Sequence, residues 1–184
     1  MIYPIVVYGS PLLRKVSKEI DKDYPKLNKL IDDMFETMHV SDGVGLSAPQ
    51  IGKSIRIFVI DGTALAEDDP SMEGFKRAFI NPKIIEETGD TWTFSEGCLS
   101  LPNIREDVDR SGHIRIQYYD EHFKFHDKTY NGVRARVIQH ECDHLEGVLF
   151  VDRIAPLKKK LLKGKLNDIA KGKDNAAYKT KIVK

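Results

Sequence analysis

The chain has 184 residues, of which 41% are hydrophobic and 31% charged. This length is enough to bury one hydrophobic core and is short for two domains of ordinary size. Its first residues lack the basic start, apolar segment and small-residue cleavage site of a secretory signal, and no stretch approaches the length of a membrane span. We therefore expect a single cytoplasmic domain over residues 1–184, with neither a membrane nor DNA among its partners. The net charge of +1 conceals a basic extension over residues 153–184, which carry 11 basic and 2 acidic side chains.

The first elements predicted along the chain are a turn, a helix and a stretch of small residues. A Tyr-Gly-Ser-Pro turn at residues 8–11 precedes a helix from Pro25, with apolar residues at spacings of three and four as far as Met38. Residues 41–50, SDGVGLSAPQ, then either bring the backbone close to another group or make a tight helix-to-strand connection. They do not form a phosphate-binding loop, because the third glycine and a Gly-Lys-Ser/Thr sequence are absent.

The middle of the chain is rich in strand signals. The strands that we expect span residues 55–60, 79–86, 91–94, 113–120 and 124–130. An acidic loop covers 61–75, a turn at Gly89-Asp90 joins the second and third strands, and the last two strands form a hairpin. The expected fold class is therefore α+β, with mostly antiparallel sheets around a central helix, an N-terminal helix and a C-terminal basic helix.

The central helix, predicted over about 133–145, carries the sequence His140-Glu141-Cys142-Asp143-His144. Side chains four residues apart lie on one face of a helix, so two imidazoles can bind the same metal ion while Glu141 lies beside them. In this H-E-x-x-H arrangement the carboxylate acts as a general base on water at a divalent metal. Val133 and Val137 continue the inward-facing stripe, and Gly147 follows where a helix cap is expected.

The third metal ligand must come from another part of the chain. Gly147 lies three residues after His144, as in metzincin proteases, but the next ligand position holds Phe150, which cannot bind a metal. Cys98 is the natural candidate, because a thiolate and two imidazoles form a tetrahedral set with one open position, although a lone cysteine is commonly a small buried hydrophobe. Cys142 fits that second role, because the helical geometry points it away from the two histidines. In a reducing compartment we expect no disulfide between the two cysteines.

Three segments together carry a family resemblance. The sequences GVGLSAPQ at residues 43–50, EGCLS at 96–100 and QHECDH at 139–144 closely resemble, in this order, the signature segments of bacterial-type peptide deformylases. The similarity covers about residues 4–153. The departures are Ser47, where the family usually has alanine, and Cys142, where it usually has a larger apolar residue.

The resemblance implies an enzyme that removes the formyl group from the N-terminal formyl-methionine of nascent polypeptides and releases formate. It implies Cys98, His140 and His144 as ligands of one divalent metal, with Fe²⁺ expected and Zn²⁺, Ni²⁺ or Co²⁺ possible in the purified protein, since the ligands alone do not select among them. Glu141 would move the proton. The Gln50 side-chain amide and the Leu99 backbone N–H would stabilise the oxyanion.

The residues that bind the substrate are less sharply defined by the sequence. The glycine-rich stretch around Val44 and Gly45 would hold the peptide as an added strand. The resemblance also places Glu96, Arg105 and Val137, with Val44, at the methionine pocket or along the peptide. The competing interpretations are that the two valines belong to the core and that Arg105 is a solvated charge. Asp143 either orients a ligand, pairs with an arginine or is an exposed acid.

The basic extension suggests a second partner. Leucines and lysines alternate at helical spacing from Leu157 to about Ala170, which predicts an amphipathic helix weakened by Gly164. Its lysines could dock weakly on ribosomal RNA through the phosphates. The alternative is a helix packed by its leucines, with a solvated lysine face and a frayed end from Gly172.

Two other functions use the same residues. A zinc endopeptidase could be built on the H-E-x-x-H helix, although Phe150 and Cys98 speak against it. A binding protein for formylated N-termini would have lost Glu141, Gln50 or a ligand, and this sequence retains them all.

Overall fold

The computed structural model describes residues 1–183. Its α-helices are α1 (Leu27–Val40), α2 (Gly132–Leu145), α3 (Pro156–Leu161) and α4 (Lys163–Ala170). Its strands are β1 (Ile5–Val6), β2 (Gly45–Ser47), β3 (Ile57–Asp61), β4 (Lys76–Cys98), β5 (Leu101–Tyr119), β6 (Phe125–Asn131) and β7 (Thr180–Lys181). Short 3-10 helices are η1 (Pro11–Arg14), η2 (Ala48–Ile51), η3 (Gly62–Leu65), η4 (Pro70–Met72) and η5 (Phe150–Asp152). Within residues 1–183, no helix combines the length and the apolar character that crossing a membrane requires.

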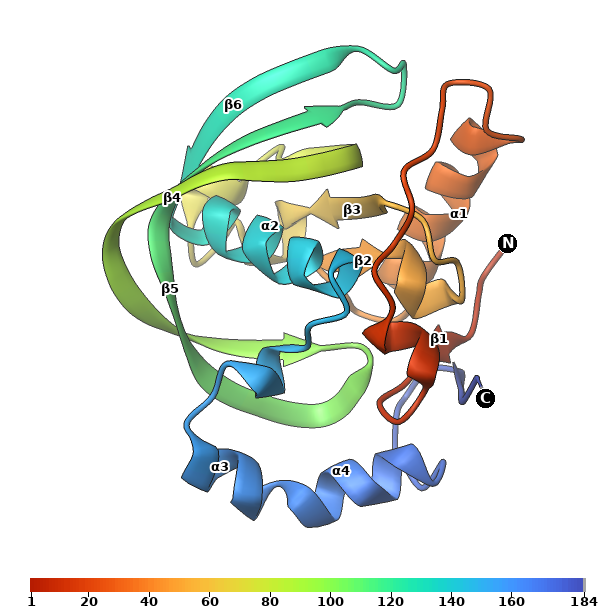
Figure 1. Cartoon of the computed structure of the whole chain (residues 1–184), viewed down its shortest axis with the longest axis vertical. Helices are drawn as coiled ribbons and strands as arrows, with labels where there is room; N and C mark the ends of the chain where they lie inside the picture. Colours follow the sequence, from red (N-terminus) through yellow and green to blue (C-terminus); the bar gives the residue numbers. More distant parts are fainter. Residues whose placement is uncertain (184) are drawn as a thin grey trace.

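The predicted α+β class is confirmed. An antiparallel sheet has the strand order β2-β3-β4-β5-β6, and β1 and β7 form a separate parallel pair. Figure 1 shows α2 lying across the molecule, with the strands of the larger sheet wrapped around it. The predicted hairpin between the last two strands is also confirmed, since β5 pairs with β6 from His113–Asn131 to Tyr119–Phe125.

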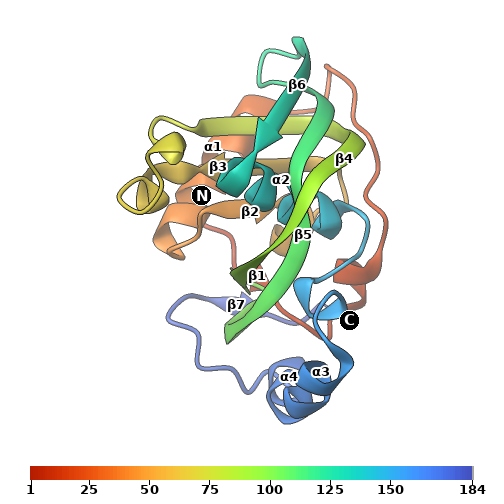
Figure 2. The ribbon, with the colours of Figure 1, turned by 90° about the vertical axis from the view of Figure 1, so that its left-hand side faces the viewer.

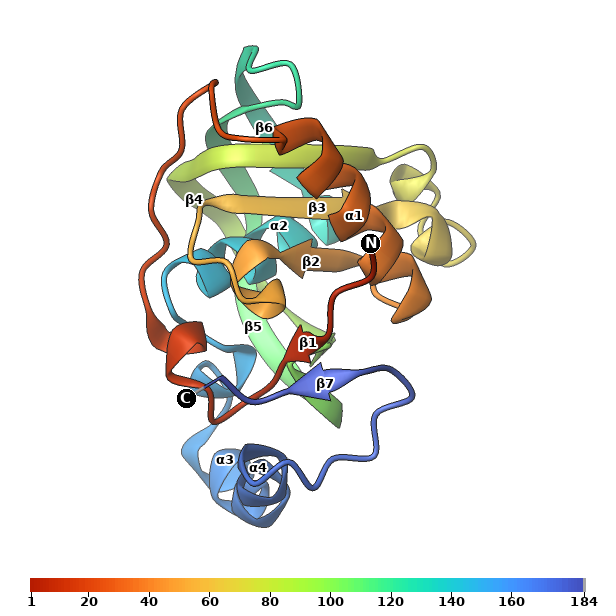
Figure 3. The same cartoon turned by 90° about the vertical axis from the view of Figure 1, so that its right-hand side faces the viewer.

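Strand β3 separates two hydrophobic cores. Because successive side chains of a strand point to opposite faces, Ile57 and Val59 pack on the α1 side, whereas Phe58 and Ile60 pack on the α2 side. All four side chains are fully buried. The two helices therefore cover opposite faces of the β2-β3 part of the sheet, as Figure 3 shows for α1. Helix α2 is therefore held inside the curve of the sheet, with β2 and β3 on one side and the long strands β4 and β5 bending around it.

The turn predicted at Gly89-Asp90 is wrong. Strand β4 continues through both residues and pairs with β5 along its length, and the register shifts between Thr88 and Thr91. Gly89 has φ +77°, and a Cβ atom at this position would collide with the His113 ring of β5. The glycine therefore makes a β-bulge that bends the long strand, rather than a turn that ends it. Figure 2 shows the resulting twist of the two strands.

The basic extension packs on the body of the protein by only part of its apolar face. Leu166 and Ile169 of α4 are buried in a third core, whereas Leu157 and Leu161 are 69% and 78% exposed. The single predicted helix is divided at Leu162 into α3 and α4. The expectation of a frayed end from Gly172 is wrong, because the chain returns to the body and pairs with β1 through β7.

Candidate active site

Helix α2 and the end of β4 bring the three expected metal ligands together. His140 and His144 lie one helical turn apart on α2, and Cys98 is the last residue of β4. One ligand atom from each of the three residues lies within 4.8 Å of the others, and the Cys98 Sγ is 3.2 Å from the His144 Nε2. Cys142 instead packs in the α2-side core with Ile138, as expected.

The Cys98 sulfur is surrounded by hydrogen-bond donors. The Gln50 Nε2 and the Ser100 backbone N–H each lie 3.4 Å from the Sγ atom. Two donors aimed at one sulfur stabilise a thiolate, which is the form of cysteine that binds metals. Residues of η2 and of the β4-β5 turn therefore orient the sulfur and favour the form that binds a metal.

The two histidines are held in different ways. The His140 Nδ1 lies 2.9 Å from the Glu96 carboxylate, which leaves its Nε2 free to bind a metal. Burial lowers the pKa of His140, but interactions with Cys98 and Glu96 outweigh burial and raise the pKa to about 10. Burial and the charge of His140 hold the pKa of His144 well below its usual value. With the Glu96 carboxylate on the Nδ1 of His140 and two N–H groups on the Cys98 sulfur, the one-sulfur, two-nitrogen donor set fits a divalent cation.

Glu141 is buried beside the ligands. The Ser47 hydroxyl donates a hydrogen bond of 2.5 Å to the Glu141 Oε2. Gly45 is required here, because a Cβ atom at this position would collide with the Glu141 carboxylate. Burial raises the pKa of Glu141, although His140 and Ser47 offset part of the rise, and a raised pKa suits a carboxylate that accepts a proton near neutral pH.

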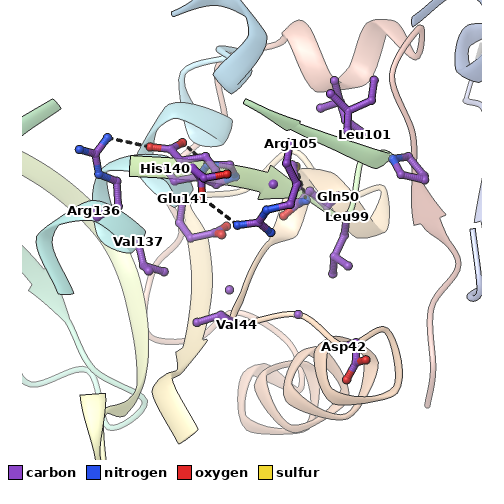
Figure 4. A pocket seen from close by; sticks show the side chains of 18 of the residues that line it. Asp42, Val44, Gln50, Leu99, Leu101, Arg105, Arg136, Val137, His140 and Glu141 are labelled. Atoms are coloured by element: carbon purple, nitrogen blue, oxygen red, sulfur yellow. Dashed lines mark hydrogen bonds and ion pairs between the residues drawn. The ribbon is translucent and has the colours of Figure 1, made fainter. Parts of the chain in front are cut away.

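A cavity of ≈ 360 Å³ opens in front of these groups. The predicted site residues that line it are Val44, Gly45, Gln50, Glu96, Cys98, Leu99, Arg105, Val137, His140 and Glu141. Figure 4 shows Val137 and Val44 on one side of this space and Leu99 on the other, with Glu141 and Arg105 between them. His144 lies behind the cavity and is fully buried.

Glu96 lines the cavity, but its carboxylate is engaged inside the protein. It accepts hydrogen bonds from Arg110 at 2.7 and 3.0 Å and from Arg136 at 3.0 Å, in addition to the contact with His140. Burial opposes its ionisation, but His140 and Arg110 hold the pKa of Glu96 well below its usual range. The expected pairing of Asp143 with an arginine is observed in the same cluster, where it accepts hydrogen bonds from Arg110 and Arg153.

Several cavity residues have no signal in the sequence. Ile104, Pro102 and Leu101 belong to β5 and have the composition of ordinary core residues. Tyr178 lies in the basic extension, 80 residues from Cys98 along the chain, and only the path of the folded chain brings it here. No spacing rule relates it to the ligands.

The sequence profile of the family described as polypeptide deformylase matches residues 2–160. The chain belongs to the polypeptide deformylase family. It is 53% identical to the peptide deformylase of Christiangramia forsetii, over 99% of this chain and 96% of that protein. Among solved deformylase structures, one from Plasmodium falciparum has a TM-score of 0.82 at 40% identity, covering 91% of this chain and 95% of that one. The Thermotoga maritima peptide deformylase gives 0.76 at 42% identity, with coverages of 85% and 99%.

The family membership confirms the resemblance drawn from the three sequence segments. All three segments contribute to the same cavity of this deformylase: η2 and β2 supply Gln50 and Gly45, the end of β4 supplies Cys98, and α2 supplies His140 and Glu141. The sequence similarity takes in the basic extension, since the Christiangramia forsetii relative matches 99% of the chain.

Proposed function

We propose that this deformylase hydrolyses the N-terminal formyl group of formyl-methionyl nascent polypeptides and releases formate. The observation that carries the proposal is the convergence of Cys98, His140 and His144 on one point, with a buried carboxylate beside them. Nascent polypeptides are made in the cytoplasm, and we propose that the protein acts there.

The proposed cofactor is one divalent cation held by Cys98, His140 and His144. When bound, it supplies Lewis acidity to water and to the formyl carbonyl. The one-sulfur, two-nitrogen donor set accepts Fe²⁺, Zn²⁺, Ni²⁺ or Co²⁺, and we propose Fe²⁺ as the native ion from the family resemblance.

Glu141 is proposed to carry the proton. Its carboxylate would accept a proton from the attacking water and donate it to the amine that leaves when the C–N bond of the formamide breaks. The Ser47 hydroxyl fixes one carboxylate oxygen, and the missing side chain at Gly45 leaves room for the other. Glu141 is therefore held in one orientation before the substrate arrives, which lowers the entropic cost of the step.

Gln50 and the Leu99 backbone N–H are proposed to stabilise the oxyanion of the tetrahedral intermediate. The Gln50 Oε1 accepts a hydrogen bond of 2.8 Å from the Ser47 backbone N–H, so the amide is oriented with its Nε2 donors toward Cys98. The Nε2 also donates to the Ser100 hydroxyl at 3.2 Å, so an N–H that now faces Cys98 or Ser100 would be shared with the oxyanion. Loss of one such donor typically costs about 10² to 10³ in rate.

The peptide is proposed to lie along the cavity, with the methionine side chain between Val44 and Val137. Gly45 and the segment after Cys98 would provide backbone hydrogen bonds, and Arg105 would lie beside the chain. Arg105 donates to the Ser95 carbonyl at 2.7 Å, which holds its side chain over the cavity wall. For Glu96 we propose a role different from direct peptide binding: its carboxylate orients His140.

We also propose weak docking of the basic extension on ribosomal RNA. Lys160, Lys163 and Lys165 are exposed and make no ion pair among residues 1–183. Deleting the basic extension would also remove Leu166 and Ile169 from the third core. The test therefore keeps the extension and replaces these three lysines with glutamine. Ribosome co-sedimentation should fall, with a weaker salt dependence, whereas glutamine at Lys83, Lys124 and Lys128 should leave it unchanged. Equal binding by both variants would refute docking through the extension.

The activity is tested by formate release from formyl-Met-Ala-Ser by anaerobically purified protein. Glu141→Gln should retain its metal and lose turnover, because the amide cannot accept the proton. Glu146→Gln is the matched control at the C-terminal end of the same helix, because Glu146 pairs with Arg56 away from the cavity, and it should keep full activity. Cleavage of an internal bond in an unformylated peptide, without formate release, would instead indicate an endopeptidase.

A further inference from the structure

The C-terminal segment forms one wall of the active site. It is anchored on both sides of Tyr178: the Asn103 side chain donates to the Asn175 carbonyl at 3.2 Å, and β7 pairs with β1 from Thr180 onward. The Val183 backbone N–H also donates to the Ser10 hydroxyl at 3.0 Å. Figure 3 shows the segment running from α4 back to β1 along the edge of the molecule. The segment is thus a fixed part of the fold rather than a loose end.

Tyr178 contacts the turn that carries the metal ligand. Its hydroxyl donates a hydrogen bond of 2.8 Å to the Leu99 carbonyl, and its side chain lines the active-site cavity. Burial raises the pKa of Tyr178, and the nearby Cys98 sulfur raises it further. The phenol therefore keeps its proton and remains a hydrogen-bond donor.

The Leu99 carbonyl and the Ser100 N–H belong to the same peptide group. A peptide group is planar, so a partner that holds its carbonyl also fixes the direction of its N–H. This N–H points at the Cys98 sulfur, at a distance of 3.4 Å. On the far side of Ser100, the Tyr8 backbone N–H donates to the Ser100 carbonyl at 2.8 Å. Hydrogen bonds from both the N-terminal and the C-terminal segment of the chain therefore hold this turn.

We propose that Tyr178 is a positioning residue for the metal centre, which acts through the Leu99–Ser100 peptide to hold the N–H···S hydrogen bond on Cys98. Hydrogen bonds to a ligand atom set its orientation and its electron donation to the metal, and their loss typically weakens metal binding by about 10- to 100-fold. Tyr178 does not touch the Cys98 sulfur and acts on it through the Leu99–Ser100 peptide, so we expect a loss of metal affinity near tenfold rather than 100-fold. This inference rests on the proposed function, because it requires Cys98 to be a ligand.

The test uses the full-length protein loaded with Co²⁺, whose thiolate-to-cobalt absorption band reports the electron density on Cys98. Tyr178→Phe removes only the hydroxyl and keeps the ring. We expect about tenfold weaker Co²⁺ affinity in competition with a chelator. We also expect the band to move to longer wavelength, because a sulfur that loses a hydrogen bond releases its electrons more readily. Thr180→Val is the matched control, since it removes the Thr180–Asp174 hydrogen bond of the same segment and leaves the Tyr178 hydroxyl in place.

The outcomes separate this inference from the proposed function. A band and an affinity identical to wild type in Tyr178→Phe would overturn the inference while leaving the metal centre intact. The same changes in Thr180→Val would also overturn it, because they would show that the stability of the segment matters rather than the hydroxyl. A wild-type protein without the cobalt band would overturn the proposed metal centre and this inference together.

Discussion

Replacing Glu96 with glutamine tests whether the buried charges around His140 hold the active site together. Glu96 is 4% exposed and accepts hydrogen bonds from Arg110, Arg136 and His140. Glutamine keeps the shape but removes the negative charge, and its NH₂ group faces guanidinium donors. Breaking a buried ion pair by removing one partner costs about 3–5 kcal/mol. In a chain of this size each kcal/mol lowers Tm by about 2–4 °C, so Tm should fall by about 6–20 °C.

Glu106 offers a matched control for this change. It lies directly opposite Glu96 in the β4-β5 ladder and pairs with the half-buried Lys158 at 2.9 Å. Surface pairs of this kind contribute about 0–1 kcal/mol, so Glu106→Gln should leave Tm almost unchanged.

Thermal unfolding and Co²⁺ affinity are measured on both variants. Glu96→Gln should also weaken metal binding by about 10- to 100-fold, because the carboxylate orients the His140 ring. Equal Tm values for the two variants would refute the buried-charge argument. A raised KM for the formyl peptide with unchanged metal affinity would instead support the expectation that Glu96 contacts the substrate.

Three further predictions follow from single contacts. Gly45→Ala should abolish formate release while the protein stays folded, because the new methyl group would displace the Glu141 carboxylate; activity above a tenth of wild type would argue against that crowding. Cys142→Ala should lower stability by about 1–2 kcal/mol and leave metal content and turnover unchanged, as measured by urea unfolding and metal analysis. Burial opposes ionisation of Asp152, but hydrogen bonds from Arg14 and Lys159 lower its pKa to about 2, below the ordinary 3.8. Asp152 therefore stabilises the fold above about pH 4, and this contribution is lost as the pH falls toward about 2. Asp152→Asn should consequently destabilise the protein at about pH 7 and have little effect at about pH 2, and equal urea midpoint differences at the two pH values would contradict the assignment.

The sequence predicted best what local geometry determines. Residues four apart on a helix share a face whatever the rest of the fold does, so the placement of His140 and His144 followed directly. The β-branched and aromatic run at residues 55–60 likewise indicated β3, which the structure places at Ile57–Asp61. Ligand chemistry made Cys98 a candidate and the family resemblance made it the expected ligand, because no local pattern relates it to His144, which lies 46 residues further along the chain.

The errors came from contacts between distant segments. A Gly-Asp pair is a strong turn signal, but the partner strand β5 runs past Gly89 and keeps β4 extended. Likewise, no local pattern in a lysine-rich tail could indicate that Tyr178 would lie against Leu99. The partners of Glu96 were missed for the same reason, since Arg110 and Arg136 come from two other elements.

The pairing of β1 with β7 joins positions 5 and 180, and so closes a loop that contains almost the whole described chain. Two residues on each strand pair directly, and the Asn103–Asn175, Tyr178–Leu99 and Ser10–Val183 hydrogen bonds hold the same segment. Short terminal pairings open at a lower free energy than buried cores do, so we expect the amide protons of β7 to exchange with solvent before those of α2. Opening would free Tyr178 while α2 kept its histidines in place. The enzyme can therefore lose the geometry around its sulfur ligand without losing its fold, because the contacts that hold Tyr178 are separate from the cores that hold α2.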